Sequence, residues 1–108
     1  MSDRLDSVFG ALADPTRRAV VETLLRDGTT TVPELARALP ITRQAVAKHL
    51  TALGDAGLVE RAPSPTRPIR YRLTDDGLGP AAAWIEATAA AWDTRLARLK
   101  RSLEAPHP

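Results

Sequence analysis

Two short helices separated by a very short turn are the feature of this sequence that most restricts its fold. Thr31 and Glu34 have the spacing of a capping box, in which a threonine hydroxyl accepts from a first-turn amide, and they predict a helix over residues 32–39. Pro40 stops this helix, and Thr42 caps the next one, whose apolar stripe consists of Val46, Leu50 and Leu53. Because only about three residues join the two helices, the pattern is typical of a helix-turn-helix.

Two more helices are expected before this pair. In the first, beginning near Asp3, the apolar residues recur at helical spacing and are Leu5, Val8, Phe9 and Leu12. Asp14 followed by Pro15 indicates an N-cap and a first helical position, where the missing amide of proline costs nothing. This second helix is expected to run to about Arg26 and to close at Gly28, with the inward-facing residues Val20, Val21, Leu24 and Leu25.

Strand character follows the helix-turn-helix. Segments 58–62 and 69–73 are expected to be strands, and in the second the apolar and arginine side chains alternate as Ile69, Arg70, Tyr71, Arg72 and Leu73. The connection between them, residues 63–68, contains three prolines, which withhold backbone donors and stiffen the chain. The sequence therefore predicts a two-stranded hairpin whose loop projects.

A long alanine-rich helix is expected at the C-terminal end, over about residues 75–103. Its apolar seam has coiled-coil spacing and consists of Ile85, Trp92, Leu96, Leu99 and Leu103. A single terminal helix has few partners for such a seam. We therefore expect two chains to pair through it.

The expected order of elements is four helices, two strands and a last helix. This mainly α order with a small β-hairpin describes a winged helix-turn-helix. No repeat or linker interrupts the sequence, so residues 1–108 are expected to form a single domain that includes the dimerisation helix.

The positive charge is concentrated in two regions. The net charge is only +2, but residues 61–74 contain four arginines and no acid. A second stretch without acids, residues 35–54, includes Arg37, Arg43, Lys48 and His49. Two local basic patches are expected on a surface that binds a polyanion.

The helix after Thr42 has a polar face suited to the major groove of DNA. Arg43 and Gln44 lie near its start, where arginine can bond guanine and glutamine can bond adenine in a bidentate manner. Lys48 and Thr51, further along, are expected to meet phosphates. The alternative is that this is only the solvated face of an amphipathic helix, and His49 is as well explained by packing as by a phosphate contact.

Arg67 stands at the tip of the hairpin and is expected to reach a minor groove or the DNA backbone. The strand arginines Arg61, Arg70 and Arg72 are either phosphate contacts or the solvated face of the hairpin. The candidate DNA-binding residues are Thr42, Arg43, Gln44, Lys48, His49, Thr51, Arg67 and Arg70.

Several other classes of function are not expected. The chain has no cysteine, which excludes disulfides and thiolate metal sites and favours a cytoplasmic protein. No apolar stretch approaches the ~20 residues of a membrane span. We find no nucleophilic triad or paired-carboxylate arrangement, so the sequence predicts neither an enzyme nor a cofactor.

Three segments carry a resemblance to a known family: residues 11–18 (ALADPTRR), residues 42–53, and residues 56–59 leading to 71–74. In these segments the chain resembles the ArsR family of bacterial winged-helix repressors. The resemblance implies a cytoplasmic homodimer that represses transcription by occupying an operator. It also implies that the first helix joins the last one in the dimer interface, with Leu5 and Phe9 adding area. A two-fold pair should select an inverted repeat with half-sites about 10 base pairs, or a multiple of that, apart.

Metal sensing is common in that family, but this sequence lacks the usual ligands. It has no cysteine, and its last helix has no histidine beside Glu86 or Asp93 to complete a zinc site between helices. The chain resembles the members without metal ligands, which act through an unknown signal or by autoregulation. Two alternatives stay open: a winged-helix module that binds another protein instead of DNA, and a metal-responsive repressor using carboxylate and histidine ligands.

Overall fold

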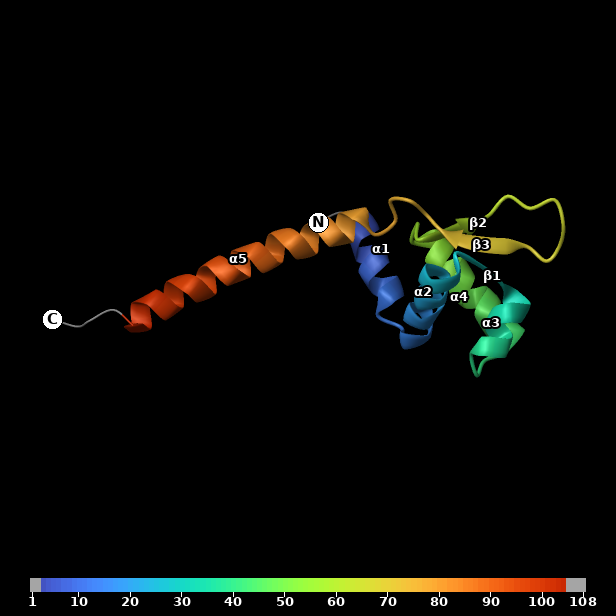
Figure 1. Cartoon of the computed structure of the whole chain (residues 1–108), viewed down its shortest axis with the longest axis horizontal. Coiled ribbons are helices and arrows are strands. Elements are labelled where there is room, and N and C mark those ends of the chain that lie inside the picture. The colour runs from blue at the N-terminus through green and yellow to red at the C-terminus, as the bar shows by residue number, and fades with distance from the viewer. Residues whose placement is uncertain (1–2, 105–108) are drawn as a thin grey trace. The chain divides into compact units, whose positions relative to one another are not determined.

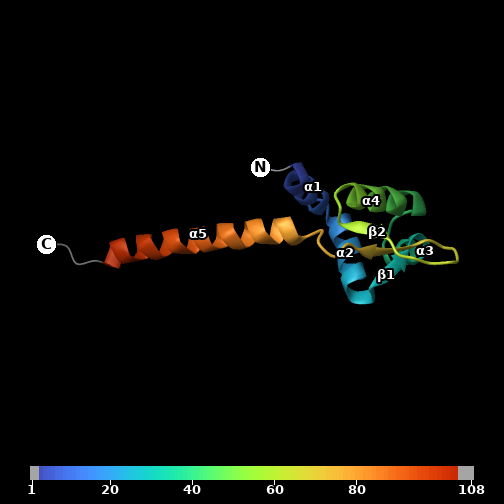
Figure 2. The same ribbon diagram turned by 90° about the horizontal axis from the view of Figure 1, so that it is seen from above.

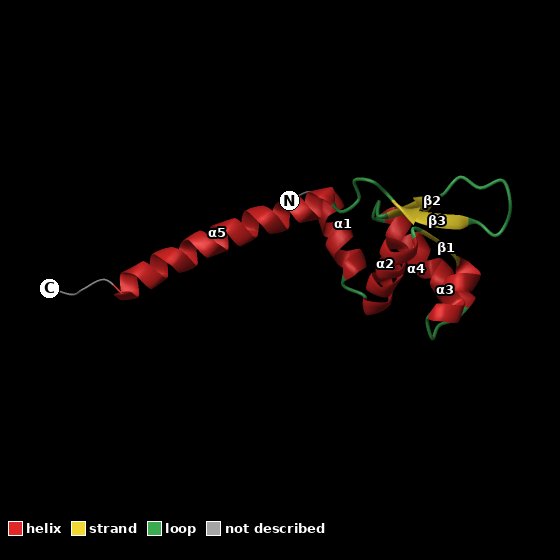
Figure 3. Cartoon of the chain, in the orientation of Figure 1, coloured by secondary structure: helices red, strands yellow, loops and turns green. Residues whose placement is uncertain are grey.

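Helices precede and follow a small sheet in the computed structural model, which describes residues 3–104 (Figures 1 and 3). The elements are α1 (Asp3–Leu12), α2 (Pro15–Asp27), β1 (Thr29–Thr31), α3 (Val32–Ala38), α4 (Arg43–Asp55), β2 (Val59–Arg61), β3 (Arg70–Leu73) and α5 (Gly79–Glu104). The chain falls into two units, one up to Leu78 and one from Gly79 onward. The first unit holds α1–α4 and the sheet, and the second holds α5.

The helix starts predicted from capping residues are confirmed. Before α2, α3 and α4, a side-chain oxygen of the preceding residue accepts a hydrogen bond from a first-turn amide, which satisfies a donor that would otherwise lack a partner. The three bonds run from the amide of Arg17 to Asp14 (3.0 Å), from that of Glu34 to Thr31 (3.2 Å) and from that of Ala45 to Thr42 (3.1 Å). Gly28 closes α2 with φ at 83°, a conformation that favours glycine.

The sheet has three strands where the sequence predicted two. It is antiparallel in the order β1-β3-β2, so β3 lies in the centre and pairs with both others. The predicted hairpin of β2 and β3 is confirmed, with strands slightly shorter than expected. β1 was missed because its sequence, three consecutive threonines, has no apolar alternation. It forms since the second edge of β3 offers backbone donors and acceptors that need partners.

The core of the first unit is formed by aliphatic side chains of all four helices and of the segment after α4. They include Val8, Val20, Leu24, Leu35, Val46, Leu50, Leu53 and Leu58. The expectation that Leu25 faces inward is wrong, because this side chain is 66% exposed. Leu25 lies about 100° around the helix from Leu24, and Thr23, whose hydroxyl donates to the carbonyl of Ala19, is buried instead.

The chain between the sheet and α5 is held against the end of α4. The Thr74 hydroxyl donates to the carbonyl of Gly57 at 2.7 Å, and the Thr74 amide donates to the carbonyl of Leu58 at 3.0 Å. Gly77 is buried in this contact. A Cβ at Gly77 would lie 2.7 Å from the Gly57 carbonyl oxygen and would also collide with the Thr74 hydroxyl. The expected helix start near residue 75 is therefore wrong, and α5 begins at Gly79.

We predict that Gly77→Ala destabilises the protein, because the backbone at Gly57 cannot move away cheaply. The cost expected for such overpacking is about 1 to 3 kcal/mol. Gly10→Ala is the matched control, since Gly10 lies within α1 and a Cβ there meets nothing within 4 Å. Thermal unfolding should show a lower Tm for Gly77→Ala and an equal or higher Tm for Gly10→Ala. Equal Tm values for both variants would contradict the packing at Gly77.

One face of α5 carries large apolar side chains that are exposed. The predicted seam residues are 51% to 75% exposed, in the order Ile85 51%, Trp92 66%, Leu96 51%, Leu99 55% and Leu103 75%. Leu5 of α1, the other side chain expected at the dimer interface together with Phe9, is buried within the single chain, at 6% exposure. Among the described residues, no helix has both the length and the apolar character needed to cross a membrane.

Candidate nucleic-acid interface

The helix α4 has the two faces that the sequence predicted. Val46, Leu50 and Leu53 are buried against the core. The opposite side consists of exposed residues, which we call the recognition face: Arg43, Gln44, Ala47, Lys48 and Thr51. This face contains two cations and no acid.

The turn between α3 and α4 brings the two helices into contact. α3 ends at Ala38, and the Leu39 amide still donates to the carbonyl of Leu35 at 2.9 Å. The Ile41 amide then bonds the carbonyl of Leu39 at 2.8 Å, which tightens the turn before Thr42 caps α4. Buried Leu35 and Val46 belong to the core shared by these helices. The short turn expected from Pro40 and Thr42 is thus confirmed.

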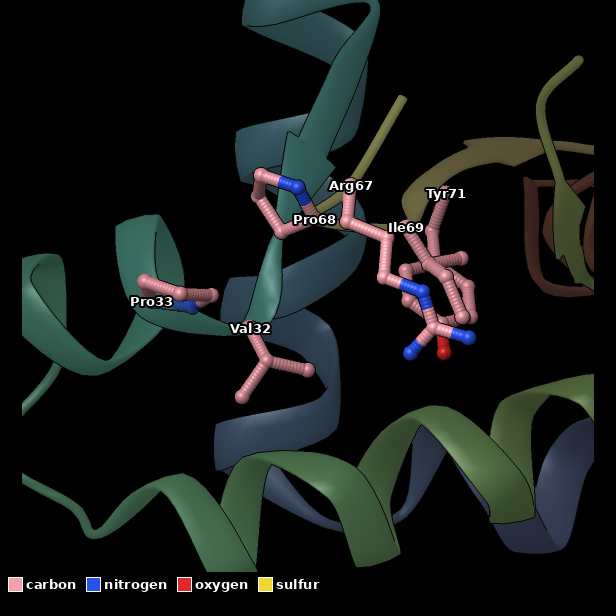
Figure 4. Close-up of a pocket in the computed structure, with 6 residues that line it drawn as sticks. All are labelled: Val32, Pro33, Arg67, Pro68, Ile69 and Tyr71. Carbon is pink, nitrogen blue, oxygen red and sulfur yellow. The ribbon is translucent and has the colours of Figure 1, made fainter. Parts of the chain in front are cut away.

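The loop between β2 and β3, residues 62–69, projects beyond the strands (Figures 1 and 2). We call this loop the wing loop, and Arg67 on it is exposed. A shallow apolar hollow of about 490 Å³ lies between this loop, β3 and the start of α3 (Figure 4). It is lined by Val32, Pro33, Arg67, Pro68, Ile69 and Tyr71. The hairpin loop of the sequence analysis therefore has the projecting position expected of a wing.

A groove joins α4 to the sheet on another side. Thr51 of the recognition face and Arg61 of β2 both line it, so the C-terminal half of α4 and the second strand border the same space. Asp55 and Glu60 also line the groove. Glu60 is neutralised by Arg72, whose Nε lies 2.8 Å from the carboxylate. Arg72 thus forms an ion pair within the hairpin.

The positively charged side chains of α4 and the hairpin differ in whether an acidic residue already pairs with them. Within residues 3–104, none of the ion pairs involves Arg43, Lys48 or Arg67. Arg70 does have partners, because its guanidinium lies 3.3 Å from Glu34 of α3 and 3.3 Å from the Thr29 hydroxyl. The first three are free to meet an external anion, whereas Arg70 is already engaged.

Three further candidate residues have hydrogen bonds within the chain. Thr42 is the cap of α4, and the Thr51 hydroxyl donates to the carbonyl of Ala47 at 3.0 Å. The half-buried His49 accepts at Nδ1 a hydrogen bond from the Nε of Arg17, at 3.3 Å. The packing interpretation of His49 therefore has a specific partner, and the bond requires that Nδ1 carry no proton.

The long-range contacts of two residues in this region were missed by the sequence analysis. Arg17 was treated only as part of a motif, although its side chain links α2 to α4 through His49. The hydrogen bond from the backbone N–H of Arg17 also holds the pKa of the Asp14 carboxyl below the ordinary value of 3.8. Glu34 was expected to act in a capping box, but its carboxylate meets Thr30 and Arg70. Neither contact has a signal in the sequence, because the partners are 32 and 36 residues apart.

Comparison with known proteins gives consistent matches. Residues 12–62 match the family model described as a helix-turn-helix domain. The chain is 49% identical over 73 residues to the HTH-type transcriptional regulator Rv2034 of Mycobacterium tuberculosis, a match that covers 68% of this chain and 66% of that protein.

Two solved structures extend the match over nearly the whole chain. An ArsR-like transcriptional regulator from Rhodococcus sp. RHA1 is 43% identical, with a TM-score of 0.77 and 95% of both chains covered. The chain belongs to the ArsR family of winged helix-turn-helix regulators. A homodimeric winged helix-turn-helix domain from Mycobacterium bovis is 25% identical, with a TM-score of 0.64, and the match covers 98% of this chain and 87% of that one.

Membership of the ArsR family confirms the predicted fold class and the expectation of a DNA-binding transcriptional regulator rather than an enzyme. In the part of the chain that the structure describes, no group of three or more His, Cys, Asp or Glu side chains is placed to hold a metal ion. The second histidine, His107, lies outside the described residues.

Proposed function

We propose that this ArsR-family chain is a homodimeric repressor that reads an inverted-repeat operator with two copies of α4. The observation that carries the proposal is the recognition face. It is exposed, has no acid, and its two cations take part in no ion pair among residues 3–104. A helix of this kind fits the major groove, where side chains can bond base edges.

The first turn of α4 would read bases. Arg43 can bond guanine O6 and N7, and Gln44 can bond adenine N6 and N7. Lys48, one turn further along, would meet a phosphate, and Arg67 on the wing loop would enter the neighbouring minor groove or reach the backbone. The support for these roles is the exposure of all four side chains.

The three candidates with internal hydrogen bonds are compatible with phosphate contacts to different degrees. Thr42 accepts the cap bond through its oxygen, so its hydroxyl proton can still be donated to a phosphate. The bond from Arg17 places the proton of neutral His49 on Nε2, which leaves that donor available. Thr51 would have to exchange its bond to Ala47 for one to phosphate.

The exposed seam of α5 supports dimerisation. Its residues alternate in steps of three and four from Trp92 to Leu103, which keeps them on one side of the helix. An apolar stripe that is more than half exposed along a helix of 26 residues is typical of an interface. The homodimeric relative from Mycobacterium bovis supports the same assembly. Two-fold pairing would then require a two-fold symmetric operator.

Selection of bound duplexes from a random library, followed by affinity measurements on the enriched site, tests the proposal. The enriched site should be an inverted repeat with half-sites about 10 base pairs, or a multiple, apart. With Lys48 and Arg67 of two subunits neutralising phosphates, log K should fall with log salt with a slope of about −3.6 or steeper. A monomer at micromolar concentration with no preference among duplexes would refute the proposal.

Repression itself requires a separate measurement. Transcription in vitro from a promoter that overlaps the selected site should fall when the protein is added, because bound protein excludes the polymerase. The region upstream of the protein's own gene is the first promoter to test. A rise in transcript would identify an activator, and binding to a partner protein without any duplex preference would favour the protein-interaction module.

A further inference from the structure

We propose that Arg70 is a positioning residue, which holds the wing to the helix-turn-helix instead of contacting DNA. The inference rests on the proposed function and adds the part of the chain that fixes where the wing loop starts. Arg70 is the first residue of β3, so the wing loop ends immediately before it. Arg67, the proposed groove contact, lies three residues upstream.

The guanidinium of Arg70 is held by two other elements. Its Nη2 lies 3.3 Å from Glu34 Oε1, in the first turn of α3, and its Nη1 donates to the Thr29 hydroxyl of β1, also at 3.3 Å. These two bonds use both terminal nitrogens of the guanidinium. Each terminal nitrogen keeps a second N–H, so the two bonds fix the position of the guanidinium without using all of its donors.

Glu34 is held in position by hydrogen bonds to two neighbouring threonines. Its second carboxylate oxygen accepts from the hydroxyl of buried Thr30 at 3.4 Å, and its amide donates to the cap Thr31. A negative charge in the first turn of a helix is also favoured by the helix dipole. Contacts within β1 and α3 therefore position the Glu34 carboxylate independently of Arg70.

The pair connects the two parts of the proposed interface. Glu34 belongs to α3, which packs on α4, whereas Arg70 belongs to the central strand of the sheet. The pair Arg72–Glu60 has the same composition but lies within the hairpin, between β3 and β2. Only the first of these two ion pairs ties the hairpin to the helix-turn-helix.

The two roles of Arg70 predict opposite effects of Glu34→Gln on operator binding. If Arg70 contacts phosphate, removal of the acid that occupies it should tighten binding. If Arg70 positions the wing, the same substitution should weaken binding. Half-exposed ion pairs of this kind are worth about 0.2 to 1 kcal/mol, so the expected weakening is up to about fivefold for each half-site.

The experiment measures operator affinity and its salt dependence for Arg70→Gln, Glu34→Gln and the control Glu60→Gln. We expect the first two to weaken binding to a similar extent with an unchanged salt slope, and the control not to weaken it. Tighter binding by Glu34→Gln, or a salt slope reduced by about 0.9 per subunit in Arg70→Gln, would overturn the inference and make Arg70 a phosphate contact.

Two combined variants separate positioning of the wing from a general effect on stability. In an Arg67→Ala background, Arg70→Gln should have little further effect, because the contact that it positions is already absent. The double variant Arg70→Glu with Glu34→Arg restores an ion pair with its charges exchanged. It should bind the operator more tightly than either of these two substitutions alone. Fully additive losses, or no recovery, would contradict the inference. If the parent protein itself binds no duplex, it is the proposed function that fails.

Discussion

Leu96→Asp is expected to separate the dimer into monomers and to abolish tight operator binding. Leu96 lies in the middle of the α5 seam and is 51% exposed in the single chain. Full burial of a leucine side chain contributes about 1.5 to 3 kcal/mol. In a two-fold interface the substitution removes Leu96 from both subunits, and each side chain has about half of its surface left to bury. The dimer dissociation constant should therefore rise by about 10- to 100-fold from the lost burial alone. The buried carboxylates would add to this loss.

Analytical ultracentrifugation over a range of protein concentrations measures this effect, and anisotropy with the selected operator measures its consequence. The matched control is Leu25→Asp, because Leu25 is an exposed leucine of α2 outside the seam, with 66% exposure. It should remain dimeric and bind normally. Circular dichroism should show both variants folded, since neither side chain belongs to the core. A fully dimeric Leu96→Asp would exclude the seam as the interface.

Gln44→Ala is expected to relax sequence preference at one base position of each half-site while sparing general affinity for DNA. A good bidentate contact between a side chain and a base discriminates by about 1 to 3 kcal/mol. The proposed dimer would use the residue twice, so affinity for the operator should fall by about 30-fold or more, whereas affinity for random duplex should be nearly unchanged. Arg43→Ala should have a similar effect at its own base position.

Lys48→Ala is the informative contrast, because a phosphate contact carries no sequence information. This variant should weaken operator and random duplex alike and reduce the salt slope by about 1.8 for the dimer. Arg26→Ala serves as the control for charge, since Arg26 is exposed on α2 and pairs with Asp27. If Gln44→Ala weakens binding to all duplexes equally, the glutamine is not a base-reading residue and the orientation of α4 in the groove must differ.

Much of the local structure could be predicted from the sequence because it depends on residues three or four positions apart. The caps at Asp14, Thr31 and Thr42 each bond an amide three residues later, and the buried stripe of α4 repeats with the helical period. The alternation in β3 is also local, with a period of two residues. These patterns were sufficient for the order of the helices and for the recognition face.

Other features depend on partners that are distant in the sequence. β1 is a strand only because it pairs with β3, more than 38 residues later, as in the register of Thr31 with Arg70. Leu25 is exposed although its neighbours Leu24 and Val21 are buried, since the position of the core around α2 decides which side is inside. α5 begins at Gly79 instead of near residue 75, because the hydrogen bond from Thr74 to Gly57 holds the preceding segment against the end of α4.

The sequence by itself determined the helices, their caps, the hairpin and the residues that α4 exposes, because these follow from short-range periodicity and hydrogen bonding. The tertiary structure alone decided which arginines are free. Arg67 and Arg70 were both candidate DNA contacts from the sequence, yet only Arg70 meets a carboxylate, on a helix 36 residues away. An ion pair depends on distances in space, and sequence spacing contains no such distance.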